Sequence, residues 1–225
     1  MRPSMNPDMC KCIKELRLKA KNREFNCCKE CLRSSAEKYP IFAVGCEKHQ
    51  TDKFPVILFV LRDPSSPQKE GITGCKQDGN VCYWCHDDPS AKNMGEIIEK
   101  IPGLKKDKGQ RYPAYFINAV LHGAEKNQKP NSKTIKACSQ ILKTFIKLLK
   151  PKIVVALGLD ARNAISYAYK KEMPNFKKKI TKPYIFDGMG FWWTYHTSPQ
   201  SFNNKETEIR KAFDKIANFL NSTIS

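Results

Sequence analysis

Four short apolar segments that alternate with helical patterns constrain the fold of this chain more than any other feature. The segments are rich in β-branched and aromatic residues, which is typical of buried strands, and they cover residues 56–61, 114–120, 153–157 and 191–196. The spacing of amphipathic helices is found at residues 91–101, 132–150, 161–171 and 206–220. Strands that alternate with helices predict an α/β fold, with three αβα layers around a mainly parallel four-stranded sheet.

Polar or small residues stand at the carboxyl end of every predicted strand. Asp63 follows the first strand in FVLRDPSS, Asn118 lies in the second, Gly158 follows the third and His196 ends the fourth. Each has an ordinary explanation by itself, as a turn aspartate, a capping asparagine or a histidine satisfied at a strand end. Because ligands bind outside the carboxyl ends of parallel strands, their shared placement predicts a functional site.

The charge of the chain makes nucleic acid the leading candidate partner. Forty Lys and Arg against 22 Asp and Glu give a net charge of +18, spread along 225 residues. Neutralising phosphates releases counterions, although solvated lysine-rich helix faces are an equally good explanation of charge alone. We expect one domain over residues 1–225 and a monomer with no obligate protein partner. Without a signal peptide or membrane span, we expect an intracellular protein, in the cytoplasm or nucleoid or in a nucleus.

The cysteines predict a metal site near the N-terminus. The chain has ten, and in a reducing compartment they are expected as thiols or metal ligands. Residues 1–50 form a cysteine-rich segment in which Cys10 and Cys12 precede Cys27, Cys28 and Cys31 by about fifteen residues, a spacing that suits structural zinc. A second group is expected to be buried or incidental: Cys75, Cys82, Cys85 and His86.

Several motifs in this order resemble the uracil-DNA glycosylase superfamily. Asp63-Pro64 resembles its GQDP motif, FINAVL at residues 116–121 resembles LLNAVL, and HTSPQS at residues 196–201 resembles HPSPLS with Thr197 in place of a proline. More weakly, VCYW at residues 81–84 aligns with LCFS. Other stretches resemble the iron–sulfur branch: CKECL at residues 28–32, and a cysteine thirteen residues before PKIVVALG.

The chain departs from that branch in two places. Where the branch has a further cysteine after the strand-two asparagine, this chain has His122, and its GEAPG loop is replaced by LRDPS. The resemblance implies a four-iron, four-sulfur cluster held by Cys28, Cys31, Cys138 and one more ligand. Zinc, with Cys10 and Cys12 among its ligands, is the alternative.

The resemblance implies a monofunctional hydrolase that removes uracil, or a related deaminated base, from DNA in base excision repair. Asp63 would orient the attacking water, and His196 would donate a hydrogen bond to uracil O2. Asn118 would read the Watson–Crick edge, and Tyr83, or alternatively Trp84, would stack on the base. No motif lysine is placed to form a Schiff base, so lyase activity is not expected.

Other positions bear on selectivity and on DNA contact. Ser65 replaces the tyrosine that blocks the thymine methyl in the widespread branch, so a mispaired thymine or hypoxanthine is a possible substrate. Ser198, Gln200 and Ser201 are candidate DNA contacts, and Phe202 would either insert into the DNA stack or pack in the core.

Two other functions fit the sequence. One is a non-catalytic binder of uracil-containing or damaged DNA on the same fold. The other is an unrelated α/β metalloprotein that uses its cysteines in redox chemistry. Salt-sensitive DNA binding separates the glycosylase and the binder from the metalloprotein, and turnover separates the glycosylase from the binder.

Overall fold

The structure is a computed structural model. It describes residues 11–13, 15, 16, 18, 19, 22, 24–29, 56–63, 89–101, 104, 114–121, 128–174 and 182–224.

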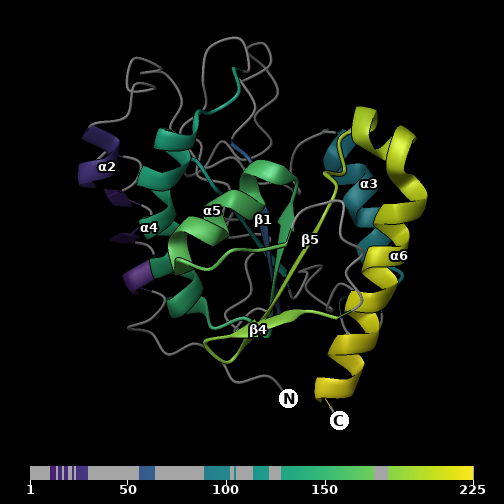
Figure 1. Ribbon diagram of the computed structural model, residues 1–225. Helices are drawn as coiled ribbons and strands as arrows, with labels where there is room; N and C mark the ends of the chain where they lie inside the picture. The colour runs from purple at the N-terminus through teal and green to yellow at the C-terminus, as the bar shows by residue number, and fades with distance from the viewer. Residues whose placement is uncertain are drawn as a thin grey trace.

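A mainly parallel sheet forms the centre of the molecule (Figure 1). Its strands are β1 (Ile57–Leu61), β2 (Ala114–Asn118), β3 (Ile153–Leu157), β4 (Tyr184–Phe186) and β5 (Met189–Thr194). The order is β2-β1-β3-β5-β4, and every neighbouring pair is parallel except β4 and β5. The carboxyl ends of β2, β1, β3 and β5 therefore lie at one edge, which we call the rim.

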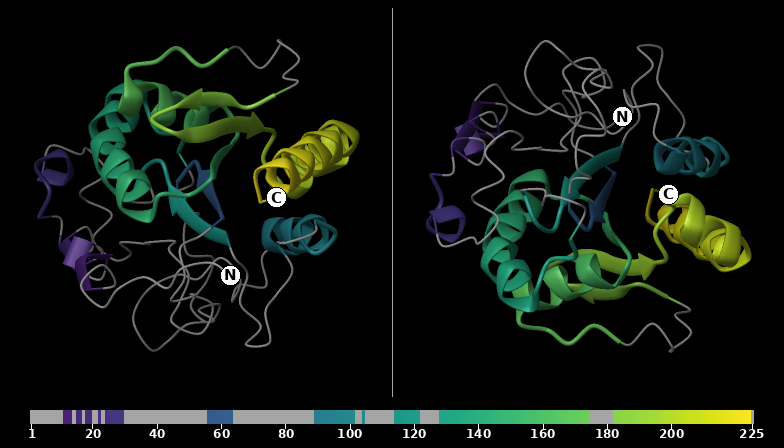
Figure 2. Two further views of the ribbon diagram at one scale, coloured as in Figure 1. Left: turned by 90° about the horizontal axis from the view of Figure 1, so that it is seen from below. Right: turned by 90° about the horizontal axis from the view of Figure 1, so that it is seen from above.

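Helices cover both faces of this sheet, which confirms the predicted αβα layers. They are α2 (Asn26–Lys29), α3 (Pro89–Ile98), α4 (Ser132–Leu149), α5 (Leu159–Tyr169) and α6 (Pro199–Ile224). Figures 1 and 2 show α4 and α5 on one side of the sheet and α3 and α6 on the other. Within the described part of the chain, no helix is long and apolar enough to span a membrane.

The strands form because their side chains are buried on both faces. In β1, Leu58 and Val60 pack into the core with α4 and α5, whereas Ile57, Phe59 and Leu61 pack into the core with α3 and α6. All five residues of β1, β2 and β3 are buried. Burial on both faces explains why these strands are continuous apolar runs rather than alternating patterns.

The predicted sheet of four strands was one strand short, because β4 adds an antiparallel edge. β4 and β5 form a hairpin in which Phe186 pairs with Met189 across Asp187 and Gly188. Both turn residues have positive φ, 48° and 71°. An Asp-Gly pair between two strands is a strong hairpin signal. β4 escaped prediction because it has three residues, of which Tyr184 and Ile185 are exposed.

The last helix begins earlier than its sequence pattern predicts. It starts at Pro199. The helical backbone is interrupted at Lys205, where φ is −137° and ψ is 19°, and the predicted start at residue 206 comes directly after this break. The helical periodicity in the sequence therefore identified only the part of α6 after the break. The first part, 199–204, directly follows the segment that carries His196.

Candidate active site

The four positions singled out in the sequence, at residues 63, 118, 158 and 196, all lie at the rim. Leu61 pairs with Asn118 in the sheet, and pairing continues beyond the strands, where the Val120 backbone N–H donates to the Arg62 carbonyl at 3.0 Å. At the other side, the Gly158 N–H donates to the Thr194 carbonyl at 2.8 Å. Since β3 lies between β1 and β5, the chain positions that follow those two strands are separated by about 10 Å, twice the usual strand spacing.

Gly158 directly follows β3 and so lies between the ends of β1 and β5. Its φ is 97°, a conformation that favours glycine, and a Cβ built there would lie 4.0 Å from the Cβ of His196. A larger side chain would therefore extend into the space beside His196.

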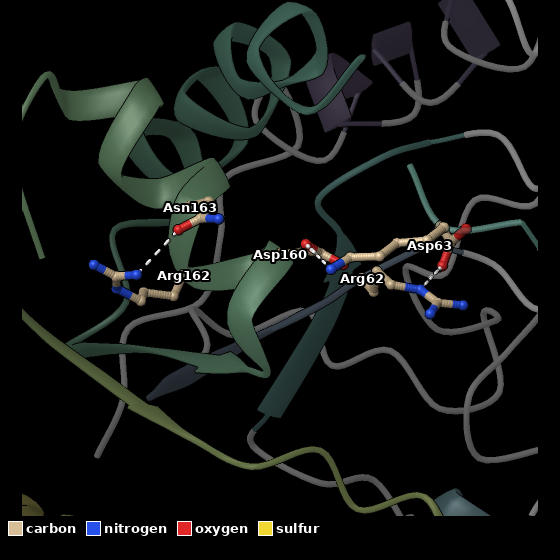
Figure 3. Close-up of polar contacts among 6 residues, drawn as sticks. Arg62, Asp63, Asp160, Arg162 and Asn163 are labelled. Atoms are coloured by element: carbon tan, nitrogen blue, oxygen red, sulfur yellow. Dashed lines mark hydrogen bonds and ion pairs between the residues drawn. The ribbon is translucent and has the colours of Figure 1, made fainter. Parts of the chain in front are cut away.

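Asp63 presents a shielded carboxylate at the end of β1. Its side chain is 2% exposed and forms an ion pair with Nε of Arg62, a contact visible in Figure 3. Buried carboxylates are stabilised by such pairs. The rim therefore holds a carboxylate two residues beyond the Leu61–Asn118 pair, joined to Arg62.

Asn118 is the most unusual residue of the site. It is 3% exposed, yet neither Nδ2 nor Oδ1 has a hydrogen-bond partner among the residues that the structure describes. More than 90% of buried polar groups are paired, because an unpaired one costs about 1–3 kcal/mol. A buried amide with an unmatched donor and an unmatched acceptor is suited to a ligand that offers the complementary pair.

His196 is oriented by the backbone that follows it. The Ser198 N–H donates to Nδ1 of His196 at 2.9 Å. Because Nδ1 accepts this bond, the proton of the neutral imidazole is on Nε2. The structure therefore makes Nε2 a hydrogen-bond donor.

Helix α3 is hydrogen-bonded to the residue that follows His196, an interaction that the sequence did not predict. Thr197 is fully buried, and its hydroxyl donates to the Ser90 carbonyl at 3.1 Å. Nδ2 of Asn93 donates to the Thr197 carbonyl at 2.9 Å. We call these two bonds the α3 clamp. The one available signal was that Thr197 stands where the resembled motif has a proline.

The predicted DNA-contact residues fall at the start of α6. Gln200 is exposed, and Ser198 and Ser201 are half-buried. Phe202 is 8% exposed, packs in the core with α3 and β1, and lies under the guanidinium of Arg210 at 5.5 Å. Of the two roles considered for Phe202, the structure therefore shows packing in the core.

Part of the predicted metal set comes together on the opposite side of the sheet from α3 and α6. Cys28 of α2 and Cys138 of α4 are each 1% exposed and lie in the same core cluster, whereas Cys12 is exposed. Within the described residues, no group of three or more His, Cys, Asp or Glu side chains is placed to hold a metal. Cys10 and Cys31 lie outside those residues. Two buried thiols on packed helices fit part of the ligand set of a thiolate-ligated metal.

Other predicted residues also lie outside the described part of the chain. They are Ser65, Tyr83, Trp84, His122 and the second cysteine group at residues 75–86.

Comparison of this chain with known proteins identifies its family. The model of the Uracil DNA glycosylase superfamily matches residues 74–221, more than half of the chain. A Type-4 uracil-DNA glycosylase of Sulfurisphaera tokodaii is 31% identical over 139 residues, which cover 56% of this chain and 58% of that protein. Another, of Saccharolobus solfataricus, is 27% identical over 133 residues, covering 56% of each chain. The chain thus matches less than two thirds of either relative's length. The family match, together with the rim residues described above, shows that this chain belongs to the uracil DNA glycosylase superfamily.

Proposed function

We propose that this protein is a monofunctional DNA glycosylase that hydrolyses the bond between deoxyribose and uracil, or a related deaminated base. The observation that carries the proposal is the buried, unpartnered amide of Asn118 on the same rim as Asp63 and His196. The names of the relatives, both uracil-DNA glycosylases, support it.

Asn118 supplies the recognition step. The Nδ2 group donates to uracil O4, and Oδ1 accepts from uracil N3–H. Cytosine presents a donor and an acceptor in the reverse order, so it leaves both atoms of an amide held in this orientation unpaired. Such a mismatch in a dry site is strongly unfavourable. The base reaches the rim only when it is turned out of the DNA stack.

His196 and Asp63 supply the chemistry from either side of the base. As the bond to the sugar breaks, negative charge develops on uracil O2, and the Nε2–H of His196 donates a hydrogen bond to it. The carboxylate of Asp63 orients a water toward the sugar carbon and stabilises the positive charge that develops on the sugar. The Nδ1 bond from Ser198 holds His196 as a donor without requiring a charged imidazolium.

Residues around this centre would complete the substrate site. Tyr83 is proposed to stack on the base, and the small Ser65 leaves room for a thymine methyl. Ser198, Gln200 and Ser201 are proposed to contact DNA phosphates at the start of α6. Hence thymine opposite guanine, and hypoxanthine, belong among the test substrates.

We also propose a cluster site formed by Cys28 and Cys138 with Cys31 and a further ligand such as Cys10 or Cys12. A four-iron cluster bound there would be structural, fastening α2 to α4. Metal analysis and absorbance of anaerobically purified protein test this. Iron and sulfide with a broad visible band, both reduced in Cys138→Ser, are expected. Colourless protein with zinc would favour the alternative metal, and protein with neither would remove the site.

The excision assay that tests the main proposal uses labelled oligonucleotides with uracil, thymine opposite guanine, or hypoxanthine, in single- and double-stranded form. Asp63→Asn should lower the single-turnover rate by about 100-fold or more. Asp160→Asn is the matched control, since Asp160 is also a buried acid after a rim strand, 3.7 Å from Lys129 Nζ (Figure 3). It should stay within about threefold of the wild type.

Two results would contradict the proposal. Full activity of Asp63→Asn would remove Asp63 from the mechanism. Tight, lesion-dependent binding by the wild-type protein without any base release would instead show the non-catalytic DNA binder.

A further inference from the structure

Helix α4 carries a row of lysines along its exposed face. Lys133, Lys136, Lys147 and Lys150 are exposed, and the half-buried Lys143 places its ammonium 5.2 Å from the centre of the Tyr169 ring. Spacings of three, four and seven residues put all five on one side of the helix, opposite its buried side. We call these five residues the α4 lysine stripe.

No acidic residue balances this charge along the chain. The sequence contains neither Asp nor Glu between Glu125 and Asp160. Among the described residues, none of the four exposed lysines of the stripe pairs with a carboxylate. Helix α6 differs, because its cations pair with its own acids: Lys205 with Glu208 at 3.0 Å, and Arg210 with Glu206 at 2.7 Å.

The stripe helps α4 to fold only at its end, where Lys147 in the last turn and Lys150 at the C-cap meet the negative end of the helix dipole. Lys133 lies in the first turn, which has no acidic residue and where the helix dipole favours negative charge. Lys143 and Lys147 repel each other at a spacing of four, and Lys147 and Lys150 do so at three. A helix that bears these repulsions without an acidic residue of its own is suited to an external polyanion.

The side chains along the stripe favour a nucleic-acid backbone over an acidic protein. Protein interfaces are anchored by aromatic residues and arginine and are poor in lysine. Between the lysines, the exposed residues are Gln140 and Thr144, and this face has no exposed aromatic residue. From position 133 to 150 the stripe spans about 26 Å, the length of about seven or eight nucleotides along one strand of a duplex.

We propose that the α4 lysine stripe is a second DNA-binding surface, which holds phosphates of DNA outside the segment whose base enters the rim. Helix α4 follows β2 and precedes β3, so it runs from the rim toward the opposite edge of the sheet (Figure 1). The stripe therefore leads away from the site. Only the choice of DNA as the polyanion rests on the proposed function.

The test measures how the affinity for an undamaged duplex depends on salt, by fluorescence anisotropy. The variant Lys133→Gln, Lys136→Gln, Lys147→Gln removes three exposed charges from the stripe. The control Lys100→Gln, Lys171→Gln, Lys211→Gln removes three exposed charges: one from the turn after α3, one just after α5 and one from α6. Each phosphate contact contributes about 0.9 to the slope of log affinity against log salt. We expect the stripe variant to lose about 2 to 3 from this slope and the control to lose less than about 1.

Equal changes in the two variants, or no change in either, would overturn the proposal. So would an unchanged DNA slope together with lost binding of a polyglutamate peptide, which would indicate an acidic protein partner. Thermal melts check that both variants are folded. Single-turnover excision at saturating enzyme should be unaffected in the stripe variant. A wild-type protein without excision activity but with the expected slope difference would contradict the proposed function and leave this inference intact.

Discussion

Replacing Asn118 by leucine is expected to stabilise the free protein while it abolishes base excision. The two side chains branch at the same atom, so the leucine methyl groups take the places of Oδ1 and Nδ2. Those two atoms are buried and have no hydrogen-bond partner in the described part of the chain. The substitution therefore removes two unsatisfied polar atoms and breaks no hydrogen bond between described residues.

The size of the effect follows from the cost of burying unpaired polar atoms. Each such atom costs about 1–3 kcal/mol, so removing both stabilises the protein. The bulkier leucine offsets part of this stabilisation, because it strains the packing around it. We expect the free energy of unfolding to rise by about 1–3 kcal/mol. In a chain of this size, each kcal/mol raises the melting temperature by about 2–4 °C.

Urea unfolding and single-turnover excision measure the two effects on the same preparations. Excision of uracil should fall by about 100-fold or more, because the site loses its donor to the base. Asn93→Leu is the matched control: the Asn93 amide donates to the Thr197 carbonyl, so its loss should destabilise the protein. If Asn118→Leu destabilised the protein as much as Asn93→Leu does, the Asn118 amide would be bonded in the free protein and the reasoning would be refuted.

Two further predictions concern groups behind the site. Thr197→Val breaks the bond to the Ser90 carbonyl and should lower kcat about 10-fold, with KM little changed, because His196 is then misplaced. Thr197→Ser keeps the hydroxyl and should restore kcat. An equal loss of kcat in both variants would exclude the hydroxyl as the cause. Burial, and secondarily the charge of Asp187, raises the pKa of Tyr169, so the folded state keeps a proton that the unfolded state releases above about pH 10. Stability should therefore fall as the pH rises past 10. Tyr169→Phe should lose that dependence and be more stable at pH 7, since the buried hydroxyl has no hydrogen-bond partner among the described residues. Urea unfolding at pH 7 and above pH 10 checks this, and an equal loss of stability with pH in the variant and the wild type would contradict it.

Local patterns in the sequence were enough to predict most elements and the location of the site. The strand predicted at residues 153–157 matches β3 at both ends, because an apolar run bounded by Lys152 and Gly158 leaves little freedom. The helix predicted at residues 132–150 matches α4 to within one residue. Asn131 caps its start, since Oδ1 of Asn131 accepts a 2.8 Å hydrogen bond from the Thr134 N–H, and its apolar spacing is regular. Alternation of strand and helix then placed residues 63, 118 and 196 at one edge of the sheet.

Contacts between distant segments decided the rest. β4 is a strand only because β5 lies beside it, and its exposed side chains carry no buried pattern to detect. Asn93 lies 104 residues from Thr197, so the α3 clamp depends on how α3 packs. The burial of Asn118 without a partner, and of Phe202 in the core, depends likewise on what surrounds each side chain.

The sequence by itself thus determined which segments are buried, and through their alternation the fold class and the edge that carries the site. Periodicity records burial along one segment, because it reflects which side chains avoid water. It does not record which distant group meets a given hydrogen-bond donor or acceptor. Only the tertiary structure decided which polar atoms at the rim are held in place and which are left for a ligand.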